Sequence, residues 1–458
     1  MAKNTKKAKR SQAKAFTQEQ IALLSINPNA AGIDIGSAEH WVAVPKGRAE
    51  HSVRKFGCFT ADLHAMAVWL KLCGITTVAM ESTGVYWIPP FQILESHGFE
   101  VKLVNARHVA NVSGRKTDVS DCQWIQTLHT YGLLAGSFRP DNEMCVLRSY
   151  YRHRDNLVKS ASSQILLMQK SLIQMNLQIH KVISDITGAT GMRIIRAILA
   201  GERDAQILAL MRAPGVKRTK EDIMKALQGD YRVEHLFTLN HAVELYDTYQ
   251  EKIRQCDEKI ELCLKGFDGQ EICDDMPPSA KKGKNKNAFT LQTELYRITG
   301  VDFTAIDGLS ALAVSIIISE VGFDYTAFPT EKHFASWLGL SPNNRITGGK
   351  IKKTSTKRVF NRAANMFRLA AQSLANSRCA IGAFYRRLRS RLGAPKAITA
   401  TAHKLARIFY AMWKTKSTYN DVGADYYEKQ YKERLIHNIK RKAKEFGFKL
   451  VPLMELAA

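Results

Sequence analysis

The sequence predicts an α/β domain near the N-terminus, a long helical middle region and a mostly helical C-terminal domain. Three observations support this prediction. Short apolar segments alternate with helical stretches between residues 28 and 140. Leu, Ile and Met then recur at three- and four-residue spacing through residues 143–200, which is the periodicity of an amphipathic helix. The chain of 458 residues is long enough for two or three domains with hydrophobic cores.

The first region reads as three hairpin-like strands followed by a strand–helix–strand–helix series. The strands are expected at residues 31–35 (AGIDI), 41–44 (WVAV), 52–59, 76–80 (TTVAM) and 101–104 (VKLV). The helices are expected at residues 61–73, ending at Gly74, then after Pro90, and from Asp118 to about Leu134. A mixed sheet built in this order is the arrangement of an RNase-H-like fold.

The middle region is predicted to be almost wholly helical over residues 143–200, with a second long amphipathic stretch at 234–265. These stretches fit either an antiparallel coiled coil or a simple helical pair. Residues 274–287 (DDMPPSAKKGKNKN) have the composition of an exposed linker. The sequence predicts helix and linker within residues 200–293 but does not indicate what this segment does in the function of the protein.

The C-terminal region, residues 294–420, contains the turn IDGLS (306–310), an apolar helix after it, and later helices after Thr354 and Pro395. The turn and its helix resemble a helix–hairpin–helix, whose backbone N–H groups can hold a phosphate. A core helix that follows a glycine fits equally well. The predicted divisions are a basic disordered tail at 1–27, an N-terminal domain at 28–142, the helical region with its linker at 143–293, a C-terminal domain at 294–420 and a tail at 421–458.

The charge balance indicates a polyanionic partner. There are 67 Lys and Arg residues against 42 Asp and Glu, a formal net charge of +25. Nucleic acid is the first candidate and an anionic membrane surface the second. No apolar run is long enough to span a bilayer, and the N-terminus lacks the apolar core of a signal peptide. We therefore expect a cytoplasmic, nucleoid-associated protein without a membrane partner. Its eight scattered cysteines, without a CxxC pair, indicate reduced thiols.

The distribution of charge points to one segment in particular. Residues 332–420 contain 19 Lys or Arg and no Asp or Glu. A surface that only faces solvent mixes both signs, so this segment is predicted to contact nucleic acid, against the alternative of a plain basic surface. The residues expected to contact phosphates are Arg345, Lys350, Lys352, Lys353, Lys357, Arg358 and Arg362.

Four acidic residues stand where the predicted fold would bring them together. Asp34 lies inside the first strand, and Glu81 directly follows the fourth. Asp118 and Asp121 are three residues apart at the start of a helix, so they share one helix face. Clustered carboxylates at strand ends suit Mg²⁺ or Mn²⁺, which can drive an in-line phosphoryl displacement. Arg115 and Lys116 add positive charge for a phosphate backbone.

Each acid taken alone has a simpler interpretation. Asp34 could simply end a strand, and Asp118 could be only a helix N-cap. Their joint order along the chain is what favours a metal site, with Asp34, Glu81, Asp118 and Asp121 as both the metal ligands and the catalytic carboxylates.

Two segments of the sequence resemble a known family. The contexts GIDIGSAEHWVAV, ESTGVYW and GRKTDVSDCQWI around the four acids resemble the DEDD transposases of insertion sequences, whose catalytic domain is RuvC-like. The later segment FASWLGLSPNNRITGGKIKKTSTKRVFNRAANMFRLAA resembles the C-terminal transposase domain of the same family. The resemblance covers residues 28–140 and 294–415, in the family's order.

The resemblance implies more than the composition does. It implies DNA recombination between element ends and a target, directed by a structured bridge RNA, in a homo-oligomer that is a dimer or tetramer. It also implies that a serine hydroxyl of the C-terminal domain forms a covalent link to DNA. Here Thr347 stands at that position, in ITGGK. The threonine methyl group crowds the attack, and Ser341 is the alternative nucleophile. The two glycines could equally form only a turn.

Other functions explain parts of the sequence. A RuvC-like Holliday-junction nuclease, acting without a covalent intermediate, accounts for the carboxylates but not for the C-terminal segment. An actin-like ATPase shares the first strand motif, but the second phosphate loop it requires is not found in the sequence. A non-catalytic nucleic-acid-binding protein accounts for the charge but not for four ordered acids. A covalent protein–DNA product distinguishes the transposase from the other three.

Overall fold

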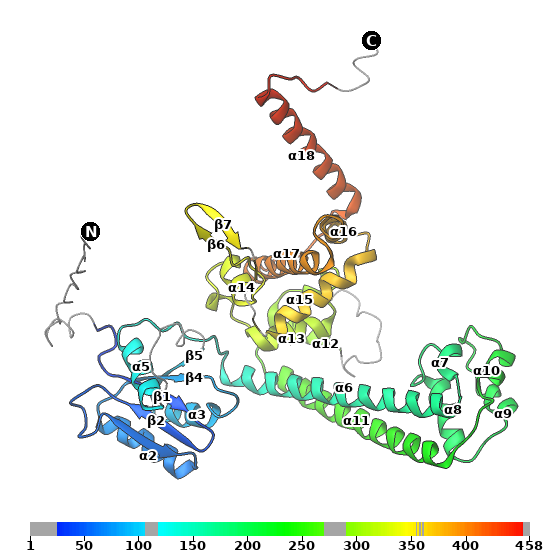
Figure 1. Cartoon of the computed structure of the whole chain (residues 1–458), viewed down its shortest axis with the longest axis horizontal. Coiled ribbons are helices and arrows are strands. Elements are labelled where there is room, and N and C mark those ends of the chain that lie inside the picture. The colour runs from blue at the N-terminus through cyan, green and yellow to red at the C-terminus, as the bar shows by residue number, and fades with distance from the viewer. Residues whose placement is uncertain are drawn as a thin grey trace, which may run out of the picture. The chain divides into compact units, whose positions relative to one another are not determined.

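The computed structural model describes residues 25–105, 118–269, 290–353, 355–356, 359 and 361–451 (Figure 1). The chain divides into two compact units between Arg139 and Pro140. Within the described residues no helix has both the length and the apolar character needed to span a membrane. The predicted linker at residues 274–287 lies outside the described part of the chain.

The first unit is built on a mixed five-stranded sheet. Its strands are β1 (Ala30–Ile35), β2 (Glu39–Ala43), β3 (Val53–Gly57), β4 (Thr77–Glu81) and β5 (Glu100–Val104). The strand order is β3-β2-β1-β4-β5. The first three strands pair antiparallel, whereas β1, β4 and β5 pair parallel. This arrangement confirms the predicted α/β fold class with a mixed sheet, and its order of elements is the one expected of an RNase-H-like domain.

Helices cover both faces of this sheet (Figure 1). On one face, α2 (Thr60–Leu72) and α3 (Ile88–Ser96) pack over the larger hydrophobic core. On the other, α5 (Asp118–Thr130) packs over a smaller cluster that includes Ala79 and Ile125. Helix α3 begins before Pro90 rather than after it, because proline is tolerated in the first helical turn. Helix α5 ends before Gly132, which has φ +68°, so the predicted end at Leu134 is wrong.

The second unit begins with a long antiparallel helical hairpin. It pairs α6 (Asn142–Gln174) with α11 (Val233–Lys265) (Figure 1). The start of α6 meets the end of α11, where Cys256 contacts the Tyr150 carbonyl. Further along, Met168 and Leu172 of α6 share a core with Leu239 and Val243 of α11. The sequence left open a coiled coil or a helical pair, and the two helices do pack as a pair.

The expectation of nearly continuous helix over residues 143–200 is wrong. Helix α6 ends at Gln174, and Asn176 takes the left-handed conformation with φ +55°. Four short helices then form a module at the tip of the hairpin, and Ile194 and Ile198 of this module belong to the same core as α6 and α11. They are α7 (Ile179–Val182), α8 (Ala189–Leu199), α9 (Ala205–Leu210) and α10 (Lys220–Ala226).

A buried ion pair joins the two long helices. The Arg154 guanidinium donates to both carboxylate oxygens of Asp257, at 2.5 and 3.2 Å, and each residue is 4% exposed. Burial raises the pKa of Asp257, although Arg154 opposes that shift. Replacing Arg154 with Met would leave a buried carboxylate without its partner. We expect the free energy of unfolding to fall by about 3–5 kcal/mol, measured by chemical denaturation.

An exposed pair between α8 and α11 provides the matched control. Arg196 donates to Asp247 at 2.8 Å, but the two side chains are 57% and 46% exposed. An Arg196→Met change should therefore cost less than about 1 kcal/mol. Equal effects of the two substitutions would contradict a special role for the buried pair.

The remainder of the second unit is a helical bundle around an aromatic core. Its helices are α12 (Leu291–Thr299), α13 (Ala311–Val321), α14 (Glu331–Trp337), α15 (Arg362–Ser373), α16 (Ala380–Leu392) and α17 (Ala394–Thr415). Phe334, Phe367, Phe409 and Trp413 are fully buried there. The Trp413 indole N–H donates to the Phe323 carbonyl at 3.0 Å. Helix α13 contributes buried residues to this bundle, which fits the core-helix interpretation of the IDGLS segment.

Two elements extend from the bundle (Figure 1). A hairpin pairs β6 (Arg345–Thr347) with β7 (Lys350–Lys353). Helix α18 (Gly423–Glu445) has no buried residue and lies where the sequence predicted only a tail. The base of α18 is fixed by Asp421, which accepts the Ala380 N–H at the start of α16, and by Tyr431, whose ring lies 3.2 Å from the Arg387 guanidinium carbon.

Candidate active site

Two of the predicted carboxylates occupy equivalent positions on neighbouring parallel strands. In the pairing of β1 with β4, Ile33 lies opposite Met80, so Asp34 and Glu81 occupy the next position on each strand. Both side chains are half-buried. Side chains alternate between the faces of a sheet, so Asp34 shares the face of Gly32 and Glu81 that of Ala79. This is the face that α5 covers.

The close approach of α5 to β1 depends on Gly32. A Cβ atom at this position would lie 2.2 Å from the Gln126 backbone nitrogen and 2.4 Å from the Cys122 carbonyl oxygen. The helix backbone therefore lies directly on the strand, two residues before Asp34. Because Asp121 precedes Cys122, this contact sets the distance between the helix acids and the strand acids. Nothing in the sequence indicates this contact, although Gly32 stands two residues before Asp34 in GIDIG.

The charges of Asp34 and Asp121 both act on the Glu81 carboxyl. Burial, and then the negative charges of Asp34 and Asp121, raise the pKa of the Glu81 carboxyl above its ordinary value. Burial also raises the pKa of the neighbouring Cys122 thiol to about 12, with smaller contributions from the charges of Asp34 and Asp121. Without a bound cation, Cys122 is therefore a neutral thiol at physiological pH.

Asp118 is the first residue of α5, but its side chain lies outside the described part of the structure. Its helical position, three residues before Asp121, places both on one helix face. Among the side chains that are described, no three acidic, His or Cys groups are arranged closely enough to hold a metal ion. The four side chains still fit Mg²⁺ or Mn²⁺, because all of them are carboxylates. The negative charges of Asp34 and Asp121 repel the ionised form of Glu81, and a bound cation would offset this repulsion.

A buried histidine fixes α5 to the sheet from the other end. His129 is 1% exposed, and its Nε2 lies 2.9 Å from the Thr77 hydroxyl of β4. Burial, with the charge of Lys102, lowers the pKa of His129 to about 4. The ring is therefore neutral at physiological pH, and it holds the helix in place rather than supplying charge to the carboxylates.

In the second unit, Thr347 is exposed at the end of β6 and pairs with Lys350 across the hairpin. Gly348 and Gly349 form the two-residue turn between them, with φ of +56° and +73°. Two positive φ values are the requirement of a type I′ turn, so the glycines do form a turn. Ser341, the alternative nucleophile, is half-buried and lies nearer the bundle, next to the Pro342–Thr356 bridge.

The predicted phosphate-binding residues are described only in part. Lys350 and Lys352 are exposed on the hairpin. Arg362 instead donates to Asp155 of α6 at 2.8 Å, a partner 207 positions earlier in the chain. The remaining residues lie outside the described residues or side chains: Arg115, Lys116, Arg345, Lys353, Lys357 and Arg358. Other exposed cations of the acid-free segment are Lys332, Arg378, Arg389, Arg391, Lys396, Arg407, Lys414 and Lys416.

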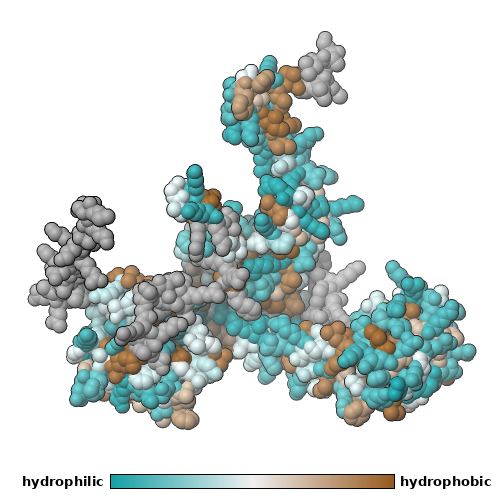
Figure 2. All heavy atoms as spheres, viewed as in Figure 1, coloured by the Kyte–Doolittle hydropathy of each residue, from teal (hydrophilic) through white to brown (hydrophobic). Residues whose placement is uncertain are grey.

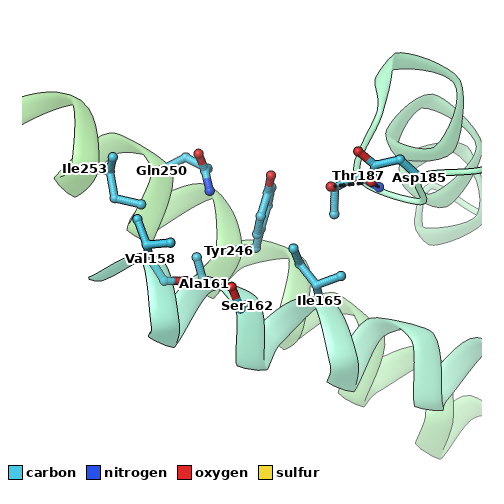
Figure 3. A pocket seen from close by; sticks show the side chains of 9 residues that line it. All are labelled: Val158, Ala161, Ser162, Ile165, Asp185, Thr187, Tyr246, Gln250 and Ile253. Atoms are coloured by element: carbon cyan, nitrogen blue, oxygen red, sulfur yellow. Dashed lines mark hydrogen bonds between the residues drawn. The ribbon is translucent and has the colours of Figure 1, made fainter. Parts of the chain in front are cut away.

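A small open pocket of about 140 Å³ lies elsewhere in the second unit, between the α6–α11 hairpin and the loop before α8 (Figure 3). Asp185 points into it, but this carboxylate accepts both the N–H and the hydroxyl of Thr187 in its own loop. Apolar side chains such as Val158 and Ile165 form the opposite wall. None of the predicted site residues lines this pocket.

Comparison with known families gives two matches. Residues 31–176 match a family model of the DEDD type from IS110 elements, described as a transposase. Residues 302–386 match a second model, described as the transposase of the IS116/IS110/IS902 family. Together the matches cover about half of the chain. The first contains all four acids and the second contains Thr347. No curated protein matches the chain.

Proposed function

The chain belongs to the IS110 family of DEDD transposases, and from this premise we propose that it cuts and rejoins DNA strands through a covalent protein–DNA intermediate. The observation that supports the proposal is the effect of the Asp34 and Asp121 charges on the Glu81 carboxyl, whose pKa they raise. Four carboxylates, including Asp118, would hold Mg²⁺ or Mn²⁺, which activates a nucleophile and stabilises the leaving oxygen.

Thr347 is the proposed nucleophile. Its hydroxyl oxygen attacks a DNA phosphorus, the bond from phosphorus to one deoxyribose oxygen breaks, and that oxygen leaves as a free hydroxyl. The threonine proton passes to solvent, and the departing oxygen takes up a proton from solvent. A DNA hydroxyl then attacks the phosphothreonine, which restores the threonine and rejoins the strand. The exposure of Thr347 beside a two-glycine turn supports this role, because nothing bulky at Gly348 or Gly349 obstructs a close approach of DNA.

The partners of the reaction are part of the proposal. DNA is the substrate, and we propose that a structured guide RNA directs the protein to its target within a homo-oligomer, as the resemblance implies. The acid-free segment and α18, which has no buried residue, provide basic surface for both nucleic acids. Sequencing the RNA that copurifies with the protein tests the guide: one recurrent structured species is expected, and a random sample of cellular RNA would contradict it.

The decisive experiment for the function is the search for a covalent product. Duplex DNA carrying the element ends is incubated with the protein and Mg²⁺, and the mixture is separated under denaturing conditions. A DNA species that is retarded by bound protein and released by protease is expected. Cleaved strands without such an adduct would favour the Holliday-junction nuclease instead.

Alanine at both Lys350 and Lys352 should weaken DNA binding and flatten its salt dependence. Each lost phosphate contact removes about 0.7–0.9 from the slope of log K against log salt, so a decrease of about 1.4–1.8 is expected for the pair. Fluorescence anisotropy titrations at several salt concentrations measure this slope. Alanine at Lys217 and Lys225, which are exposed on the hairpin module, is the control. An unchanged slope in the Lys350/Lys352 variant would remove the β6–β7 hairpin from the DNA-binding surface.

A further inference from the structure

The β6–β7 hairpin has two chemically different faces. Across the two strands Ile346 pairs with Ile351, and Thr347 pairs with Lys350. Successive residues of a strand point to opposite faces, so the isoleucine pair lies on one face and the Thr347–Lys350 pair on the other. The hairpin is therefore apolar on the side that faces away from the proposed nucleophile.

The isoleucine pair is exposed. Ile346 is 62% exposed and Ile351 is 58% exposed. Figure 2 shows hydrophobic surface on this projecting hairpin beside hydrophilic neighbours. Lys350 and Lys352 are exposed around the pair, and no acid occurs between residues 332 and 420. The isoleucine pair is therefore surrounded only by positive charge. Such a surface complements a polyanion that also presents an apolar group. A second copy of the hairpin is equally basic and would be repelled.

The shape of the hairpin fits one groove of DNA. From the Pro342–Thr356 bridge to the turn at Gly348, six residues reach about 20 Å at most. The major groove of B-DNA is about 12 Å wide and 8.5 Å deep and admits a two-stranded ribbon, whereas the minor groove is only about 6 Å wide. When a ribbon in this groove, about 8.5 Å deep, has one face on the base edges, the phosphates of the two rims flank it at the level of its other face.

The base edges in that groove present one apolar group, the C5 methyl of thymine. We propose that Ile346 and Ile351 are specificity-determining residues that contact thymine methyl groups in the major groove, while Thr347 and Lys350 face the phosphates at its rim. This proposal rests on the proposed function, because it requires DNA as the substrate. It adds a direct reading of the duplex by the protein, made by residues next to the nucleophile.

Deoxyuridine tests the proposal, because it differs from thymidine only by the missing methyl group. A duplex that the wild-type protein selects from a random pool is prepared with thymidine or with deoxyuridine throughout. The wild-type protein should bind the deoxyuridine duplex about fourfold more weakly for each methyl group that it contacts. The variant I346S/I351S should bind the thymidine duplex more weakly and lose this discrimination, with an unchanged salt slope.

The control variant I207S/L210S removes two exposed apolar side chains from α9, which are 45% and 66% exposed. It should keep the full preference for thymidine. Equal binding of both duplexes by the wild-type protein would overturn the proposal, as would a preference that survives in I346S/I351S. A change of oligomeric state in I346S/I351S, measured by sedimentation, with its thymidine preference intact, would instead assign the isoleucine face to a second copy. A covalent adduct formed without any thymidine preference overturns only this inference, whereas the absence of any adduct counts against the proposed function.

Discussion

Replacing Asp34 with Asn should abolish DNA cleavage while leaving the protein folded and able to bind DNA. The substitution keeps the shape of the side chain but removes one anionic oxygen ligand from the carboxylate cluster. Loss of several kcal/mol of metal-dependent transition-state stabilisation corresponds to a decrease in rate of about a thousandfold or more. The rate of strand cleavage in Mg²⁺ is the measurement, with DNA affinity and the thermal unfolding midpoint recorded in parallel.

Two further substitutions sharpen the interpretation. Glu81→Gln should abolish cleavage equally, but it should not destabilise the protein, because it removes a half-buried charge that Asp34 and Asp121 disfavour. Glu39→Gln is the control: this acid lies on β2 of the same sheet, with a side chain 44% exposed and paired with Lys55, and its replacement should leave the cleavage rate unchanged. Wild-type recombination by the Asp34→Asn protein would show that the cluster does not hold the catalytic metal.

The strand acids could be located from the sequence because their context is local. The strand around Asp34 and the strand before Glu81 are short apolar segments, and the order of elements along the chain fixes which strands become neighbours. What brings Asp121 to them is not local. The helix can lie on β1 only because Gly32 has no Cβ to collide with Cys122 and Gln126, and a glycine within a strand pattern does not reveal what packs against it.

Long-range contacts account for most of the other differences. Arg362 was predicted to contact phosphate on charge alone, but its partner Asp155 lies on a helix 207 positions away. Helix α6 is followed by a left-handed residue at Asn176, and no Gly or Pro near this position predicts the end of the helix. The short helices beyond it are stabilised by a shared core with α11, not by their own periodicity. The two different faces of the β6–β7 hairpin depend on which residues pair across its strands, and this register is known only from the structure.

Replacing Thr347 with Val should end covalent capture of DNA while leaving DNA affinity close to that of the wild type. Valine keeps the branched shape of threonine and its preference for a β-strand, but it has no hydroxyl to attack phosphorus. The product to follow is the protease-sensitive protein–DNA adduct on a denaturing gel, which should fall below detection. Ser341→Ala, on the bundle side of the same hairpin, should form the adduct at the wild-type level.

The reverse change separates a role of the hydroxyl from a role of the side chain's shape. Thr347→Ser keeps the hydroxyl and removes the methyl group that crowds its approach, so adduct formation should be retained or increased. A merely structural role would give the opposite order, because serine is the poorer strand residue and valine the better one. If Thr347→Val still forms the adduct and Ser341→Ala does not, then the nucleophile is Ser341, and the exposed turn at Gly348 and Gly349 serves only to bring the hairpin onto the DNA.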